Sequence, residues 1–163
     1  PSPSMSHGCE LLTACKIATL TREQFLEGVS RNPKLAEVLI TSLSQSEATA
    51  FHHLTTVGRR YARERIAALI YELSFRAKQK GMSNWATLPL KQIHIADALG
   101  LTTEHVCRTV RELREDGLIH TANGAISVED LTGLGEEALM DVGEAGLWWS
   151  APGTRSAAPS ATG

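Results

Sequence analysis

The chain has few of the residues from which catalytic or metal centres are built. Its three cysteines, Cys9, Cys15 and Cys107, are too few and too scattered for a disulfide framework or a four-ligand zinc site. No glycine-rich phosphate loop or nucleophile–base signature is present, and no apolar run reaches the roughly 18 to 20 residues that span a bilayer. We therefore expect a non-enzymatic protein of the reducing cytoplasm, without metal or cofactor and without a membrane segment.

The net charge of −2 over 163 residues conceals an asymmetry along the chain. Residues 51–120 carry eleven Lys/Arg against seven Asp/Glu, a balance of +4, whereas residues 121–163 carry one against six, a balance of −5. A basic excess favours contact with phosphate groups. The segment 51–120 is therefore where we expect a nucleic-acid contact.

That segment contains the residue pattern of a helix-turn-helix, between Gln92 and Ile119. Ala96 is small enough to let two helices cross closely. Gly100 adopts the positive φ of a helix end at no steric cost, and Thr102 caps the following helix by accepting a backbone N–H bond. The spacing predicts a first helix, a tight turn and a recognition helix over about 103–116.

The predicted recognition helix is amphipathic. Val106, Val110 and Leu113 recur at i, i+4 and i+7 and predict a buried stripe. The opposite face carries small or polar side chains at i, i+3, i+4 and i+7: Glu104, Cys107, Arg108 and Arg111. A helix with such a face suits insertion into a DNA major groove, although an ordinary helical hairpin with a solvated face gives the same pattern.

The flanks favour the DNA-binding interpretation. Asn123-Gly124 between two short runs is a strong two-residue hairpin signal, and Thr87-Leu88 before Pro89 predicts a short extended segment. Two helices followed by a hairpin make a winged helix. The alternative from another class is a non-catalytic interaction or dimerisation module, whose assembly would weaken little with salt, while DNA binding would weaken steeply.

The N-terminal part predicts one strand and two helices. Alternation over Leu11–Leu20 predicts a strand, and Thr21 with Gln24 forms a capping box for the next helix. Pro33 opens a long helix that we expect to run to about Val57. Its thin apolar stripe has little else to pack against, so we favour a homodimer seam over a single-chain core helix.

The parts that follow this long helix are less informative. Gly58 should interrupt the chain before a helix over Arg59–Lys80. The four arginines at the start of that helix are typical of solvated surface: Arg59, Arg60, Arg63 and Arg65. Residues 131–163 lose periodicity and predict a partly disordered tail, in which the pair Trp148-Trp149 has no evident role.

The order of these parts resembles the CRP/FNR family of bacterial transcription regulators. The resemblance covers Met5 to Leu131 and is strongest over Leu88–Ile119 and Asn32–Leu73. It implies a mainly α fold, with a long dimerisation helix, a winged helix-turn-helix domain and a remnant of a β-roll at the N-terminus. It also implies this division: 1–31 effector-domain remnant, 32–58 dimerisation helix, 59–130 DNA-binding domain and 131–163 tail.

The resemblance also assigns roles to single residues. Arg108 should donate to guanine and Glu104 should accept from a cytosine amino group, which agrees with base-edge chemistry. Thr103 replaces an arginine found in members that bind cAMP, and Lys91 replaces the usual Thr or Ser cap and is expected near a phosphate. Cys107 is expected to be a small contact side chain; a redox switch is the alternative.

The resemblance further implies partners and a missing portion. The partners are double-stranded DNA, a second copy of the chain and, for an activator, RNA polymerase. Most of the family's β-roll effector domain should lie outside a chain that opens on Pro1, which we interpret as a fragment. Ala50 and Phe51 stand where cAMP-binding members have a Thr-Ser pair, so we expect no cAMP binding of that kind.

Overall fold

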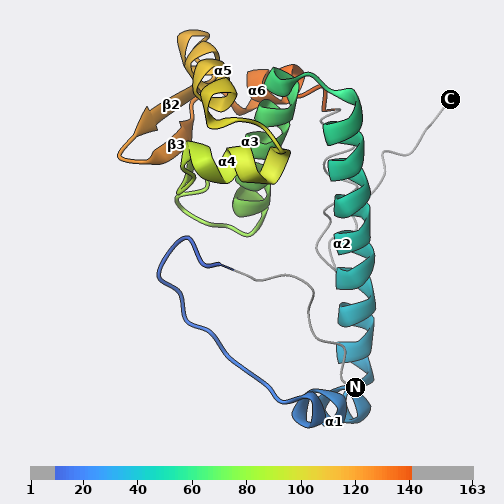
Figure 1. Cartoon of the computed structure of the whole chain (residues 1–163). Coiled ribbons are helices and arrows are strands. Elements are labelled where there is room, and N and C mark those ends of the chain that lie inside the picture. Colours follow the sequence, from blue (N-terminus) through green and yellow to red (C-terminus); the bar gives the residue numbers. More distant parts are fainter. Residues whose placement is uncertain (1–9, 141–163) are drawn as a thin grey trace, which may run out of the picture.

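A computed structural model describes residues 10–140 (Figure 1). A single long helix, α2 (Pro33–Arg59), runs along one side of the molecule, with α1 (Arg22–Arg31) at its far end. A compact group of short helices and a small sheet lies beside the other end of α2. The fold is mainly α, as predicted.

The N-terminal segment differs from the prediction in one respect. Residues 10–21 lie exposed without a strand, so the strand predicted over Leu11–Leu20 is wrong. Alternation makes a strand only where another strand satisfies its backbone N–H and C=O groups, and no described segment lies alongside to do so. The capping box at the start of α1 is confirmed, since Thr21 and Gln24 exchange bonds of 2.9 and 3.2 Å.

Helix α2 is continuous over 27 residues and passes through Gly58, contrary to the predicted interruption. It ends one residue later, where the Arg60 N–H donates to the Thr56 carbonyl. One glycine costs a helix only about 1 kcal/mol, which a long helix tolerates. Thr56 is its one buried residue in the described structure. No described helix, α2 included, combines the length and apolarity needed to cross a bilayer.

The compact group is a winged helix-turn-helix. Its elements, in chain order, are α3 (Ala62–Gln79), β1 (Thr87–Leu88), α4 (Gln92–Leu99), α5 (Thr103–Glu115), β2 (Ile119–Ala122), β3 (Ala125–Val128) and α6 (Leu131–Glu137). The three strands form an antiparallel sheet in the order β1-β3-β2. Asn123 and Gly124 connect β2 to β3 with φ of 52° and 75°, the conformation of a type I′ turn, which confirms the predicted hairpin.

One hydrophobic core joins these elements. Each helix contributes fully buried side chains, and the sheet closes the core from one side. The largest of them are Ile66 and Ile70 of α3, Ile95 and Leu99 of α4, Val106 and Leu113 of α5, Ile119 of β2 and Leu134 of α6. Because α3 contacts α4, α5, α6 and β1, it is the central scaffold on which the helix-turn-helix is mounted.

Helix α6 lies where the sequence predicted no regular structure. Asp130 caps it by accepting from the N–H groups of Thr132 and Gly133, each at 3.0 Å. Gly135 lets the helix approach α3 closely, since a Cβ there would lie 2.9 Å from Cε2 of Tyr71. Seven residues with two glycines give too short a pattern for periodicity, so the tertiary contact with α3 decides that this helix forms.

Candidate nucleic-acid interface

The turn between α4 and α5 has the geometry that the sequence predicted. Gly100 follows α4 with φ of 60°, and the Leu101 N–H donates to the Ala96 carbonyl across the turn. Ala96 is buried and Leu101 half-buried, as expected for side chains at a close helix crossing. The turn therefore fixes α5 against α4 through short contacts.

The start and the inner face of α5 are also as predicted. Oγ1 of Thr102 accepts from the His105 N–H at 3.2 Å and caps the helix. Val106, Val110 and Leu113 are buried, and Thr109 joins them. This packing fixes the rotation of α5 about its axis and turns the opposite side chains outward.

The outer face of α5 brings the predicted residues together. The side chains exposed there include Thr103, Glu104, Cys107, Arg108 and Arg111. Glu104 makes no hydrogen bond or ion pair within residues 10–140. Nη2 of Arg108 lies 3.3 Å from Nδ1 of His105, and Arg111 pairs with Glu115 at 3.5 Å. Most of the donors and acceptors on this face are therefore free to bind a partner.

Lys91 lies apart from this face, at the N-terminus of α4 and beside the tip of the hairpin. A Cβ on Gly124 would lie 3.9 Å from Cγ of Lys91. A groove between the two elements is lined by residues that include Lys91, Gln92 and Asn123. The Lys91 N–H donates to Nδ1 of His94 at 3.2 Å, while its side chain is exposed. The exposed ammonium group can therefore meet an anion between α4 and the wing.

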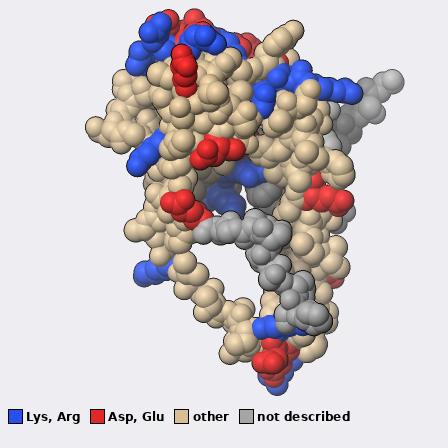
Figure 2. Space-filling view, in the orientation of Figure 1, with Lys and Arg blue, Asp and Glu red and all other residues tan. Residues whose placement is uncertain are grey.

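Charge on this part of the molecule is mixed. Figure 2 shows Lys and Arg gathered at the end of the molecule formed by α5 and α6, with carboxylates among them. Along α5, Arg108 and Arg111 stand on the outer face, whereas Glu112, Glu115 and Asp116 collect at its C-terminal end. A uniform basic surface is absent from this end of the described structure.

Three of the four arginines predicted to be solvated instead hold the domain together. Arg65 donates to the carbonyl of Leu99 at the end of α4. Arg60 donates to the carbonyls of Ala138 and Leu139 at the end of α6. Their partners lie 34 to 79 residues further along the chain, so no local pattern in the sequence could have indicated them.

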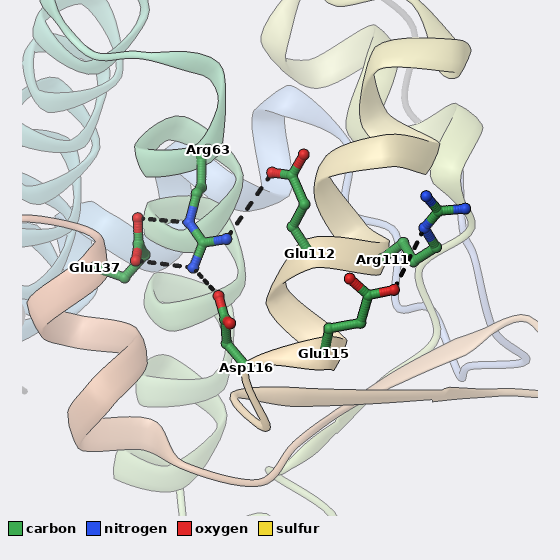
Figure 3. A network of polar contacts seen from close by, with 6 residues as sticks. All are labelled: Arg63, Arg111, Glu112, Glu115, Asp116 and Glu137. Atoms are coloured by element: carbon green, nitrogen blue, oxygen red, sulfur yellow. Dashed lines mark hydrogen bonds and ion pairs between the residues drawn. The ribbon is translucent and has the colours of Figure 1, made fainter.

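Arg63 has the densest set of contacts (Figure 3). Its guanidinium lies 2.6 Å from Asp116 and 2.9 Å from Glu137, with Glu112 at 3.9 Å. The hydrogen bond to Glu137, more than any other contact, raises the pKa of Arg63 above its ordinary value. The side chain therefore ties α3 to both α5 and α6, a role that the sequence prediction missed.

Comparison with known proteins places these features in a family. Residues 64–137 match the model of the Crp-like helix-turn-helix domain. The nitrogen fixation regulation protein FixK of Bradyrhizobium diazoefficiens is 36% identical over 126 residues, which are 73% of this chain and 49% of that protein. The transcriptional activator protein FnrL of Cereibacter sphaeroides is 30% identical over 135 residues, 79% of this chain and 53% of that protein.

Solved structures of CRP/FNR-family proteins are similar to this fold. A CRP/FNR-family transcriptional regulator of Thermus thermophilus has a TM-score of 0.55 at 28% identity, over 66% of this chain and 56% of that one. FixK2 of Bradyrhizobium japonicum has a TM-score of 0.60 at 22% identity, over 72% and 58%, and supports the fold alone. The chain spans about half the length of the relatives with which it aligns.

Proposed function

The chain belongs to the CRP/FNR family of transcription regulators and has its DNA-binding fold, and we propose that it binds a palindromic operator as a homodimer, with α5 in the major groove. The outer face of α5 carries this proposal: it is exposed, polar and largely without partners inside the described structure. A protein that binds chromosomal DNA works in the cytoplasm of a bacterium, which is where we place it.

Base reading is assigned to Arg108 and Glu104, which lie one helical turn apart on the same face. The guanidinium of Arg108 suits the O6 and N7 acceptors of guanine, and the carboxylate of Glu104 suits the amino group of cytosine. Both side chains lie in the first half of α5, the part of a recognition helix that meets base edges. A free carboxylate facing DNA is repelled by phosphates, so its presence favours a specific base contact.

Backbone contacts are assigned to the residues around these two. Thr102 and Thr103 lie at the positive end of the α5 dipole, where phosphate binds favourably. Arg111 extends the basic side of the helix, and Lys91 approaches a phosphate from the wing side. Cys107, exposed beside Arg108, serves as a short side chain that lets the helix approach the bases.

Homodimerisation is assigned to α2 because its apolar side chains follow a coiled-coil spacing. Ile40, Leu43, Leu54 and Val57 occupy a and d positions of one heptad register and are 65%, 69%, 69% and 41% exposed. Glu47 and Ala50 occupy the two core positions between them. A stripe this exposed on a helix of 27 residues needs a partner surface. A second copy of α2 presents the same stripe, so a symmetric pair would cover both. If the protein activates transcription, RNA polymerase is its further partner.

The proposal is tested by Arg108→Ala in the full chain. An operator selected from a randomised DNA library should bind the variant about 5- to 150-fold more weakly than the parent, since one bidentate base contact contributes roughly 1–3 kcal/mol. Affinity for unrelated DNA should change little. Stability should be unaffected because Arg108 makes only its contact with His105 in the described structure.

Arg31→Ala provides the matched control, because Arg31 is an exposed arginine of α1, far along the chain from the outer face of α5. Fluorescence anisotropy titrations at several salt concentrations measure all three proteins. Equal operator affinity for parent and Arg108→Ala would refute the assignment of base reading to the outer face of α5. Association that is insensitive to salt, with no operator selected, would instead support the interaction-module alternative.

A further inference from the structure

The C-terminal end of α5 carries charge of the unfavourable sign. Glu112, Glu115 and the C-cap residue Asp116 lie where the helix dipole is negative, and Arg114 is the one basic residue of that turn. Carboxylates here are repelled by the negative end of the helix dipole and by one another. Positive charge from elsewhere in the fold therefore stabilises this end of the helix, beyond the pairing of Glu115 with Arg111.

Arg63 supplies that charge from α3. Its guanidinium binds Asp116 at 2.6 Å and lies 3.9 Å from Glu112, so it meets both carboxylates on the side of α5 that faces α3 (Figure 3). Arg63 is 28% exposed, whereas Asp116 and Glu112 are 55% and 43% exposed, so solvent weakens these pairs without removing them. With its donors directed at carboxylates, Arg63 is not itself available to a phosphate.

Glu137, the other partner of Arg63, lies on a helix that is itself held against the core. Glu137 belongs to α6, which buries Leu134 against the core and is followed by its buried C-cap residue Ala138. Arg60 holds the end of α6 by donating to the carbonyls of Ala138 and Leu139. Glu137 bonds Arg63 at 2.9 and 3.0 Å and so orients the guanidinium toward α5.

We propose that Arg63 is a positioning residue that sets the tilt of the recognition helix, acting between Glu137 of α6 and Asp116 of α5. The turn at Gly100 and Thr102 holds the other end of α5, so loss of the clamp would let the helix pivot there. Arg108 lies six residues beyond Thr102, about 9 Å along a helix. A tilt of about 6° therefore displaces Arg108 by roughly 1 Å, enough to spoil a base contact. Val106 and Leu113 keep α5 folded without the clamp, so precision is lost before the fold.

This inference rests on the proposed function and is tested with Arg63→Met in the full chain, since methionine keeps much of the stem and removes the charge. Affinity for the selected operator should fall roughly 3- to 30-fold. Affinity for unrelated DNA, and the slope of affinity against salt, should stay within about twofold because the phosphate contacts remain. Arg63→Lys should recover part of the loss, since one ammonium cannot bridge three carboxylates.

Glu137→Gln should reproduce the effect, and combining it with Arg63→Met should add little. Glu136→Gln is the matched control, because Glu136 neighbours Glu137 on α6 and is exposed, with no ion pair in the described structure. An unchanged ratio of operator to unrelated-DNA affinity in Arg63→Met would overturn the proposal. This includes equal losses for both DNAs, which would indicate a smaller folded fraction.

Amide hydrogen exchange of the free protein separates failure of this inference from failure of the proposed function. Arg63→Met should speed exchange at the end of α5, where the Asp116 and Gly117 N–H groups bond back to the helix. Glu136→Gln should not. If the parent selects no operator, the proposed function fails, and unchanged exchange in Arg63→Met would independently overturn the clamp.

Discussion

Replacing Gly135 by alanine should destabilise the DNA-binding domain, although alanine favours helix. The added Cβ would lie 2.9 Å from Cε2 and 3.4 Å from Cδ2 of Tyr71. The ring has little room to move, because Tyr71 is 3% exposed and stacks on Phe75 with centroids 5.8 Å apart. Either α6 lifts from α3 or the stacked pair shifts.

Two opposing free-energy contributions decide how much Gly135→Ala destabilises the domain. Overpacking a well-packed core costs typically 1–3 kcal/mol. The helix propensity of alanine over glycine returns at most about 1 kcal/mol, and less near the end of a seven-residue helix. We expect a net loss of about 1–2 kcal/mol, which for a domain of this size lowers Tm by roughly 5 to 15 °C.

Gly58→Ala is the matched control because it makes the same chemical change where no atom lies within 4 Å. It should stabilise the end of α2 by about 0.4–1 kcal/mol. Thermal and urea unfolding followed by circular dichroism measure both variants, and Tyr71→Leu should reduce the cost of Gly135→Ala by removing the ring atoms it meets. A Gly135→Ala protein as stable as its parent would show that Tyr71 does not constrain α6 in this way.

Two further predictions concern α2. If α2 forms the proposed homodimer, Leu43→Asp combined with Leu54→Asp should yield monomers in sedimentation velocity, because two further charges at core positions oppose a coiled-coil seam. Ser42→Asp with Thr55→Asp, on the outer side, should leave the proposed dimer intact. Burial lowers the pKa of His52 below its ordinary value of 6.5, so the unfolded chain binds the proton more readily. The free energy of unfolding should therefore decrease as the pH falls from 7 toward 5.5, and His52→Gln should flatten that decrease; an unchanged slope in urea titrations would contradict the assigned cause.

The sequence predicted the helix-turn-helix and the hairpin well because the residues that determine them act locally. Gly100 requires a left-handed turn, Thr102 caps the helix three residues ahead, and Asn123-Gly124 closes a two-residue hairpin. Each of these depends on backbone geometry within a few residues, and the apolar stripe of α5 follows from helical periodicity. The roles of Glu104 and Arg108 remain predictions that the DNA titrations decide.

The remaining features depend on residues distant in the chain. The alternation over Leu11–Leu20 looked like a strand, but no neighbouring strand is there to complete it within the described residues, while α6 forms without periodicity because Gly135 fits against Tyr71. Arg63 looked like solvated surface, since its carboxylates lie 53 and 74 residues away. Local spacing was enough to predict the helix-turn-helix and the exposed polar face of α5. What holds that helix in place became visible only in the folded structure, because long-range ion pairs leave no periodic trace in a sequence.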